Sequence, residues 1–294
     1  MSFCEVKIND ISDILTLKFP EYWVFRGQEK GFPLKTSIER LLDELSYDYY
    51  WLVDPEWDIE RSFIKNFIQK AKLANIAIAS QIESVALMQH HGMSTRFLDF
   101  TESLFVALYF AVKNFDNLAG DGVVWAINLA KLYKCHVLSG KVRNVNCAGS
   151  DRVECNYRSE NITQKGFASC MVFSGSLYDY QLRQNTRFKR QKGRFLTFNN
   201  GGGFEKSLYE SFNLSRKAKQ EKPFRDLEIN LESKLIKFVI PQENKADLFS
   251  HLNRMNINEK FLFPNDDPSA PVFEKICKEM RLEFCKTELV GRNS

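Results

Sequence analysis

Residues 89–112, QHHGMSTRFLDFTESLFVALYFAV, bring a dense polar cluster directly before a strongly apolar run. The polar part holds two adjacent histidines, a glycine, the pair Thr95-Arg96, and then Asp99 and Thr101. The segment 103–115 is apolar nearly all round, which is typical of a helix buried at the centre of a protein. Polar groups this close to a buried segment indicate a site and not a solvated face. The stretch therefore predicts a central helix beside a functional site.

Two further helices are expected upstream. One covers residues 80–91 and should end at Gly92, because glycine favours the left-handed conformation common just after a helix end. His90 and His91 then lie in its last turn, at the negative end of the helix dipole, where protonation is favoured. The other helix covers residues 56–79. Its apolar stripe repeats every four residues, at Ile59, Phe63, Phe67 and Ala71.

Several segments favour strands. Residues 22–27 (YWVFRG) run through aromatic and β-branched residues and stop at glycine, which places Arg26 at the strand's C-terminal end. Residues 122–129 (GVVWAINL) and 235–240 (LIKFVI) are continuous in apolar residues, as in strands buried on both faces. Residues 187–198 (RFKRQKGRFLTF) predict a strand, a glycine-containing turn and a second strand.

The order of these elements predicts an α+β fold, with a mixed β core and flanking helices in a single domain over residues 1–294. Two segments interrupt the pattern. Residues 130–170 are rich in scattered Cys, Asn and Ser, and we expect an irregular insertion there. Residues 204–234 form a charged excursion that follows a short glycine run.

Composition excludes few classes of protein. The chain is 44% hydrophobic and 27% charged, with a formal net charge of +4 and a pI near 8.6, so its surface is only mildly basic. No apolar run reaches the roughly 18 residues needed to cross a bilayer. The N-terminus carries acids and no basic region ahead of an apolar core, unlike a secretory signal. We therefore expect a cytoplasmic protein without a membrane partner.

Seven cysteines, an odd number without regular spacing, favour reduced thiols. No pair has the two-to-four-residue spacing that presents two sulfurs to zinc from one turn. We therefore expect no metal site.

Six short motifs, in order along the chain, carry a resemblance to a known family. They are Phe25-Arg26-Gly27-Gln28, Gln89-His90-His91-Gly92, Thr95-Arg96-Phe97-Leu98-Asp99, Val123-Val124-Trp125-Ala126, Arg187 with Gln191-Lys192-Gly193-Arg194-Phe195, and Phe261-Leu262-Phe263-Pro264. Together they resemble the FRG domain, named for its Phe-Arg-Gly motif, over residues 20–265. Ser94 stands where the family commonly has proline and Phe100 where it has tryptophan, and neither difference removes a chemically active group.

The order of motifs also resembles the ADP-ribosyltransferase fold, which implies that NAD is the substrate. By this resemblance Arg26 holds NAD, and Thr101-Glu102-Ser103 is the Ser/Thr motif before a helix with Ala107 and Phe110. The position of the catalytic glutamate falls near Gln191, which is not an acid. Asp99 and Glu102 are the nearby acids that could take its place.

The resemblance implies a role for each polar residue of the motifs. Arg26 grips the diphosphate or a ribose oxygen, or else pairs with a carboxylate such as Asp99 and ties two strands together. His90 binds a ribose hydroxyl or takes a proton from the acceptor, whereas His91 faces the other side. The remaining cofactor-binding candidates are Gly27, Gln28, Thr95, Thr101 and Ser103, with the threonines equally suited to capping.

Arg96 and Asp99 are expected to pair with each other and to shape the loop between them. This places Arg96 in a structural role and not in contact with NAD.

A basic cluster surrounds Gln191, at Arg187, Lys189, Arg190, Lys192 and Arg194. It is either the solvated face of a hairpin or a rim that attracts an anionic acceptor such as RNA or single-stranded DNA.

The leading hypothesis is thus an NAD-dependent ADP-ribosyltransferase that modifies nucleic acid, with RNA favoured over DNA. Such an activity is toxic to its own cell, which suggests a bacterial toxin or anti-phage effector restrained by an inhibitory antitoxin protein. The first alternative is a non-catalytic FRG module that binds nucleotide or nucleic acid. The second is a hydrolase with His90 and Asp99 as base and orienting group, although no serine or cysteine nucleophile stands in a recognisable turn around them.

Overall fold

The computed structural model of the chain describes most of the sequence outside the segment 132–169. The described residues are 3–19, 23–48, 59–78, 81–116, 120–129, 131, 170–173, 186–198, 203–212, 219–222, 229, 233–264 and 269–291. The expected insertion 130–170 therefore lies almost entirely outside them.

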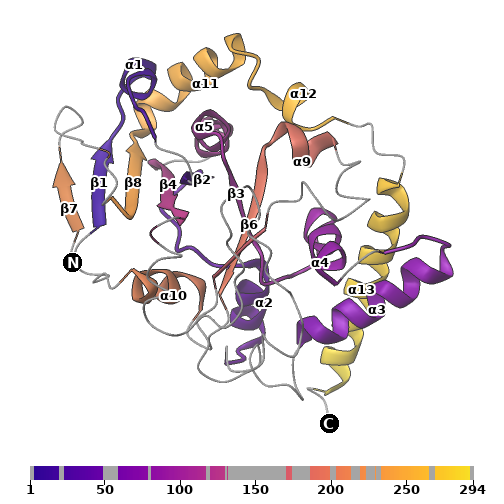
Figure 1. Cartoon of the computed structure of the whole chain (residues 1–294). Coiled ribbons are helices and arrows are strands. Elements are labelled where there is room, and N and C mark those ends of the chain that lie inside the picture. The colour runs from indigo at the N-terminus through magenta and orange to yellow at the C-terminus, as the bar shows by residue number, and fades with distance from the viewer. Residues whose placement is uncertain are drawn as a thin grey trace.

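A mixed sheet of eight strands forms the centre of the described chain, in the order β5-β6-β3-β2-β4-β8-β1-β7 (Figure 1). The strands are β1 (Phe3–Lys7), β2 (Trp23–Gln28), β3 (Leu98–Thr101), β4 (Gly122–Asn128), β5 (Cys170–Phe173), β6 (Gly193–Phe198), β7 (Lys219–Lys222) and β8 (Leu235–Ile240). Strand β1 is parallel to β7 and β8, and the other neighbours are antiparallel. The expectation of a mixed β core with flanking helices is confirmed.

Helices flank this sheet and extend it at one end. Among the described residues they are α1 (Ile11–Leu15), α2 (Ser37–Leu45), α3 (Ile59–Leu73), α4 (Gln81–His90), α5 (Leu104–Val112), α9 (Thr186–Arg190), α10 (Phe204–Ser211), α11 (Lys245–Arg254), α12 (Glu259–Leu262) and α13 (Ala270–Gly291), and a 3-10 turn lies at Gln242–Asn244. No helix of the described residues is both long enough and apolar enough to span a bilayer.

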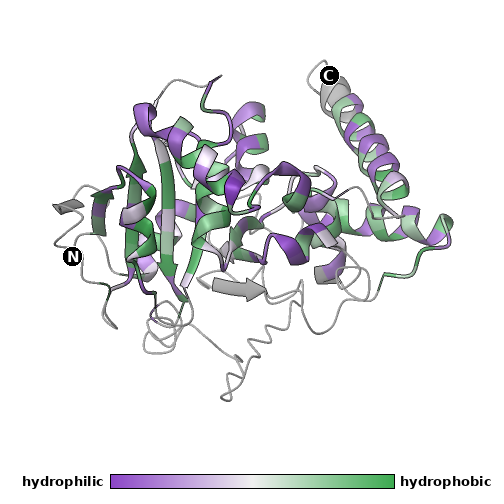
Figure 2. Cartoon of the chain, turned by 90° about the horizontal axis from the view of Figure 1, so that it is seen from above, coloured by the Kyte–Doolittle hydropathy of each residue, from purple (hydrophilic) through white to green (hydrophobic). Residues whose placement is uncertain are grey.

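Two apolar clusters cover the two faces of the sheet. Helices α5 and α11 pack on one face, where Leu108 and Leu248 meet Phe25 and Phe238. Helix α10 covers the other face, with Leu208 among side chains of β4 and β6. In Figure 2 the central strands have the green of hydrophobic residues, as expected for a sheet covered on both sides.

A third cluster lies beside the sheet and joins helices α3, α4 and α13. The predicted stripe of α3 is confirmed, since Phe63, Phe67 and Ala71 are buried in this cluster and Ile59 packs against it. Helix α4 ends at His90, and Gly92 has φ +81°, as its position after the helix predicts.

The central helix α5 lies unusually close to the sheet because two glycines face it. A Cβ atom on Gly27 of β2 would lie 1.8 Å from the carbonyl oxygen of Ala107, and one on Gly122 of β4 would lie 2.6 Å from that of Ala111. The helix begins at Ser103, whose hydroxyl accepts a hydrogen bond from the Val106 amide. The predicted central, buried helix is therefore confirmed.

The predicted hairpin over residues 187–198 is wrong in its first half. Residues 186–190 form helix α9, the chain reverses at Lys192 with φ +48°, and only Gly193–Phe198 is a strand. Phe188 folds back over the turn, so that a Cβ on Gly193 would lie 2.6 Å from its ring, and it stacks on Phe195 with ring centroids 5.2 Å apart. Alternation over so few residues fits one helical turn as well as a strand, and the aromatic packing decides between them.

The charged excursion over residues 204–234 is only partly helical. Its described residues include helix α10 and the edge strand β7, which pairs with β1. The rest of that excursion lies outside the described residues apart from the start of the segment that leads into β8.

Candidate functional site

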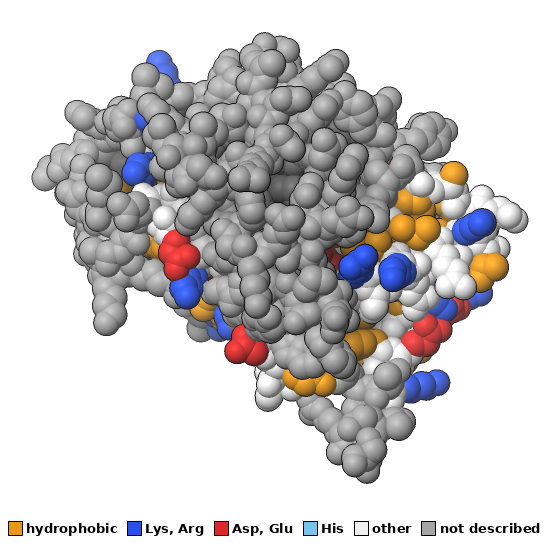
Figure 3. All heavy atoms as spheres, turned by 60° about the horizontal axis from the view of Figure 1, so that its bottom comes forward, with side chains coloured by type: hydrophobic (Ala, Val, Ile, Leu, Met, Phe, Trp, Pro, Cys, Tyr) orange, Lys and Arg blue, Asp and Glu red, His pale blue; other side chains and the backbone are white. Residues whose placement is uncertain are grey.

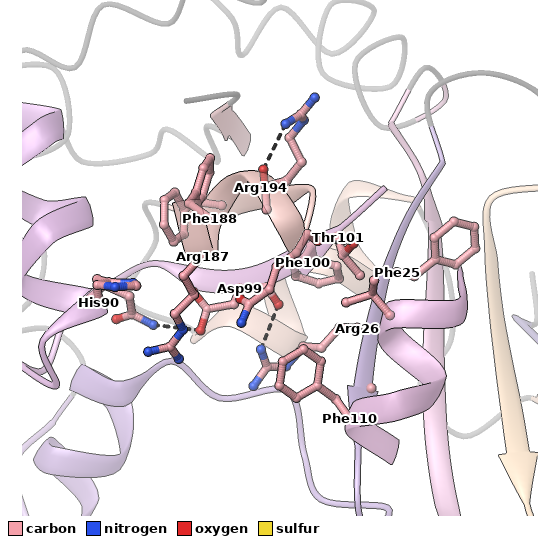
Figure 4. Close-up of a pocket in the computed structure, with 16 residues that line it drawn as sticks. Phe25, Arg26, His90, Asp99, Phe100, Thr101, Phe110, Arg187, Phe188 and Arg194 are labelled. Carbon is pink, nitrogen blue, oxygen red and sulfur yellow. Dashed lines mark hydrogen bonds between the residues drawn. The ribbon is translucent and has the colours of Figure 1, made fainter. Parts of the chain in front are cut away.

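A cavity of about 240 Å³ opens where β2, β3, α4 and α9 meet (Figure 4). Its polar lining combines most of the residues singled out by the sequence motifs. These are Arg26, Gln89, His90, Asp99, Thr101, Arg187, Gln191 and Arg194, with Gly27 and Gly193 in the walls. Aromatic rings of Phe25, Phe100, Phe110, Phe188 and Phe195 complete it.

Arg26 projects from β2 into this cavity and contacts the neighbouring strand β3. Its Nη1 donates a hydrogen bond of 2.7 Å to the backbone carbonyl of Asp99, while its buried Nε has no hydrogen-bond partner. Burial lowers the pKa of the guanidinium below its ordinary value, and the nearby Asp99 carboxylate opposes that shift. Arg26 thus ties two strands together, as the structural alternative requires, but it keeps one donor unused.

The carboxylate of Asp99 is oriented by Gln89, which was not among the expected site residues. Gln89 Nε2 donates to Asp99 Oδ2 at 3.1 Å, and Gln89 Oε1 accepts a short hydrogen bond from the Thr95 hydroxyl. Thr95 is fully buried and does not line the cavity. Its place is behind Gln89, where it fixes which way the amide faces.

Arg187 enters the cavity from α9, on the opposite side of Asp99 from Arg26 (Figure 4). Its guanidinium carbon lies 4.6 Å from the centroid of the Phe263 ring, and its buried Nε has no hydrogen-bond partner. Burial lowers the pKa of this guanidinium too, with Asp99 again opposing the shift. The basic cluster of the sequence predicted that Arg187 lies either on the solvated face of a hairpin or on a nucleic-acid rim, whereas its side chain lines the cavity.

Thr101 and Gln191 hold the turn after α9 against β3. The Thr101 hydroxyl donates to the Gln191 backbone carbonyl at 2.6 Å and accepts from the Ser103 amide at 3.0 Å. The side-chain amide of Gln191 donates to the Leu262 carbonyl at 3.0 Å. Gln191 therefore stands at the expected position in the cavity wall, with its donor committed to α12.

His90 is the last residue of α4 and lines the cavity, whereas His91 turns away from it. The two rings meet edge to face with centroids 4.9 Å apart. His91 is buried and its ring centroid lies 5.4 Å from that of Phe273 on α13. The division expected between the two histidines is thus observed, and His90 is the one within reach of a ligand.

Three expected cofactor-binding residues lie outside the cavity, namely Thr95, Gln28 and Ser103. Gln28 accepts a hydrogen bond from the indole of Trp125, Nε1 to Oε1 2.9 Å, and Ser103 caps helix α5. Gly27 does line the cavity, but its missing side chain makes room for the α5 backbone and not only for a ligand. At Gly27 it is thus helix α5, and not a ligand, that comes close to the backbone.

The basic cluster is only partly a surface feature. Arg190 donates to the Phe261 carbonyl at 3.2 Å, and Arg194 forms an ion pair with Glu102. Lys189 and Lys192 are exposed. On the face drawn in Figure 3, described Lys and Arg side chains are interspersed with Asp and Glu. Within the basic cluster itself, Lys189 and Lys192 are exposed, whereas Arg190 and Arg194 are engaged by neighbouring segments.

Arg96 does not pair with Asp99, and that prediction is wrong. Its Nε contacts Glu60 Oε2 on α3 at 2.6 Å, and its backbone amide donates to the other oxygen of the same carboxylate at 2.6 Å. Both side chains are almost fully buried, at 6% and 0% exposed. Glu60, which is 36 residues away in sequence, accepts hydrogen bonds from both the side chain and the backbone of Arg96. Asp99 therefore remains available to the cavity.

Metal ligands are not gathered anywhere in the part of the chain that the structure describes, where no group of three or more His, Cys, Asp or Glu is placed to hold an ion. The polar groups of the cavity suit an anionic ligand better than a cation, because guanidinium donors outnumber carboxylates there.

Comparison with known families gives one match. Residues 21–119 match the model of the FRG domain, a segment that includes Arg26, Gln89, His90 and Asp99. Arg187, Gln191 and Arg194 lie after the matched segment. No curated protein and no solved structure matches the chain.

Proposed function

We propose that this FRG-domain protein is an NAD-dependent ADP-ribosyltransferase and that its active site is the cavity at Arg26, His90 and Asp99. One observation carries the proposal: in the wall of a small cavity, a half-buried arginine with an unused donor is hydrogen-bonded to the backbone of the same residue whose carboxylate is held by Gln89. A buried donor without a partner costs about 1–3 kcal/mol, which an anionic ligand would recover.

The reaction would need little covalent chemistry from the protein. The bond between the ribose C1′ and the nicotinamide nitrogen breaks, and nicotinamide leaves with the electron pair. A nucleophilic oxygen or nitrogen of the acceptor then bonds to C1′ and gives up its proton. Catalysis therefore depends on gripping the diphosphate, orienting the ribose and stabilising the positive charge that develops on the sugar.

The residues of the cavity match these tasks. Arg26 presents donors to a phosphate oxygen, and the Asp99 carboxylate supplies negative charge for the cationic sugar. His90 at the rim can take the proton of the acceptor. A volume of about 240 Å³ is below the roughly 300–1,000 Å³ of pockets for drug-sized ligands, so we expect it to enclose the diphosphate and the reacting ribose, with adenosine across the rim.

A non-catalytic FRG module that binds a nucleotide is the second candidate. It is favoured by Gln191, a neutral residue at the position of the expected glutamate whose amide is engaged by Leu262. In this case the cavity would bind the same ligand class and turn nothing over.

The acceptor is proposed to be nucleic acid, RNA in preference to single-stranded DNA, attracted by exposed positive charge beside the cavity such as that of Lys192. A cytoplasmic enzyme with this activity would need an inhibitory partner, as in a toxin with its antitoxin or a defence effector. These roles follow from the proposed chemistry.

The direct test incubates the protein with NAD labelled in the adenylate part and, in parallel, total RNA, single-stranded DNA or cell lysate. Arg26→Ala should abolish transfer by weakening NAD binding. Asp99→Asn should keep NAD affinity and lower the transfer rate by about 100-fold or more, the effect typical of a lost electrostatic contact in a transition state. Arg254→Ala, which removes an exposed arginine of α11 far from the cavity, serves as the matched control.

Label in one pool, lost with Arg26→Ala and retained with Arg254→Ala, would establish both the activity and the acceptor class. NAD binding without transfer to any pool would favour the non-catalytic module. Transfer by Asp99→Asn at the wild-type rate would remove Asp99 from the mechanism.

A further inference from the structure

We propose that Arg187 and Arg26 form a two-arginine clamp for a diphosphate group, and that Phe263 positions Arg187. The inference deepens the proposed function and rests on it only for naming the ligand as NAD. The clamp itself predicts a class of ligand, a nucleoside with two adjacent phosphates. It also moves Arg187 from the acceptor surface to the binding site.

The two arginine side chains reach the cavity from different elements. Arg26 comes from β2 and Arg187 from α9, and Figure 4 shows their guanidinium groups on the two sides of Asp99. Arg194 points away from both in the same view and is paired with Glu102. Two arginines that approach one space from different elements leave room for a ligand between them.

The acidic and basic side chains that line the cavity do not balance in charge. Among the described residues that line the cavity, Asp99 is the single acid, and it lies near two guanidinium groups that stay protonated in proteins. One carboxylate cannot neutralise two buried cations. The positive charge that remains favours an anionic ligand, and a diphosphate has negative charge on two adjacent groups that can face the two arginines.

The two arginines also have unused hydrogen-bond donors. Both Arg26 and Arg187 have a buried Nε with no hydrogen-bond partner among the described residues. Each guanidinium can present two parallel N–H groups to one phosphate, which makes the pair suited to two phosphates in a row. Lysine would supply charge without this planar fork.

Phe263 holds Arg187 in place. The guanidinium carbon of Arg187 lies 4.6 Å from the centroid of the Phe263 ring, and this ring also meets Phe110 edge to face, with centroids 5.9 Å apart. The Gln191 amide and the Arg190 guanidinium bond to the Leu262 and Phe261 carbonyls, so α9 is fastened to the same segment. An arginine fixed in this way loses less conformational freedom when it binds.

Calorimetric titration with ADP, AMP and adenosine tests the clamp without requiring turnover. Wild-type protein should bind ADP more tightly than AMP. Arg187→Ala should weaken ADP binding by about 10- to 100-fold, the loss expected for a charge-assisted contact, and should weaken AMP binding less because Arg26 can still hold one phosphate. Arg187→Lys should recover only part of the ADP affinity.

Lys189→Ala is the matched control, since it removes one positive charge from an exposed position on the same helix. It should change ADP affinity by no more than about twofold, the scale of a screened surface charge. Phe263→Leu should weaken ADP binding by several-fold while Phe263→Tyr restores it, which a purely structural role for the ring would not produce. Thermal melting of each variant establishes that it is folded.

The clamp is overturned if Arg187→Ala binds ADP as the wild type does, if Arg187→Ala and Lys189→Ala lose affinity equally, or if the wild type does not prefer ADP to AMP. The proposed function fails separately. Diphosphate binding that depends on Arg187, together with no transfer from NAD, would leave the clamp in place and remove the enzyme. Transfer from NAD with unchanged ADP binding in Arg187→Ala would do the reverse.

Discussion

Replacing Gly27 by alanine should damage the fold itself, because the central helix rests on this residue. The added Cβ would lie 1.8 Å from the Ala107 carbonyl oxygen, 2.8 Å from its carbonyl carbon and 2.9 Å from the Ala111 nitrogen. All three atoms belong to the backbone of α5, so no side-chain rotation can relieve the overlap.

The size of the effect follows from that geometry. To bring the nearest pair from 1.8 Å to the 3.4 Å where ordinary contact begins, helix and strand must separate locally by about 1.6 Å. Overpacking a core costs typically about 1–3 kcal/mol and occasionally more. Since α5 also packs on β4 and α11, we expect roughly 3 kcal/mol or more, or a melting temperature lower by roughly 6–12 °C.

Urea unfolding followed by circular dichroism measures this change, with Gly31→Ala as the control. A Cβ on Gly31 would meet only a methyl group of Val123 at 3.8 Å, an ordinary contact, so that variant should stay within about 0.5 kcal/mol of the wild type. Unchanged stability of Gly27→Ala would refute the close packing of α5. If that variant were stable but no longer bound nucleotide, the glycine would instead make room for a ligand.

Three further predictions concern other parts of the molecule. Glu60→Gln removes the buried negative charge that faces Arg96 Nε, so urea titration should show a loss of about 3–5 kcal/mol, and a loss below 1 kcal/mol would contradict the ion pair. Ser46 ends α2 with φ +59°, so Ser46→Gly should stabilise the protein by about 0.5–1 kcal/mol in the same titration, and destabilisation would count against the left-handed cap. Burial raises the pKa of the Cys277 thiol to about 12, whereas Cys285 is exposed. A thiol reagent at pH 8 should therefore label Cys285 in the native protein faster than Cys277, as peptide mass spectrometry can show, and equal rates would disprove the burial.

Elements with a long, regular pattern could be predicted from sequence. The stripe of α3, the apolar helix α5 and the continuous strand β4 all have the expected type. The bounds of β4 are nearly those expected, whereas α3 ends at Leu73 and α5 at Val112, both earlier than expected. Their side chains are distributed according to which faces are buried, and a run of about ten or more residues is long enough to show that periodicity. The first part of the segment 187–198, before the turn at Lys192, is too short for this, and the stacking of Phe188 on Phe195 decided its structure.

The sequence predicted which residues form the candidate site better than it predicted how they are arranged. Arg26, His90, Asp99 and Gln191 do line one cavity, although they come from segments up to 165 residues apart. Gln89, which orients Asp99, could have been found from its place one residue before the two histidines. Nothing in the spacing of the basic cluster indicated that Arg187 would turn inward while Lys189 stayed exposed.

The sequence by itself determined which segments are buried and where α4 stops, because these depend on local periodicity and on the conformational freedom of glycine. The order of the short motifs indicated that a set of polar residues accompanies the central helix. Only the tertiary structure decided which partner each polar group has. Arg96 bonds to Glu60 and leaves Asp99 to the cavity, Gly27 admits a helix, and Arg187 faces Arg26 across Asp99. Such pairings depend on distances between segments far apart in the chain, which spacing along the chain does not encode.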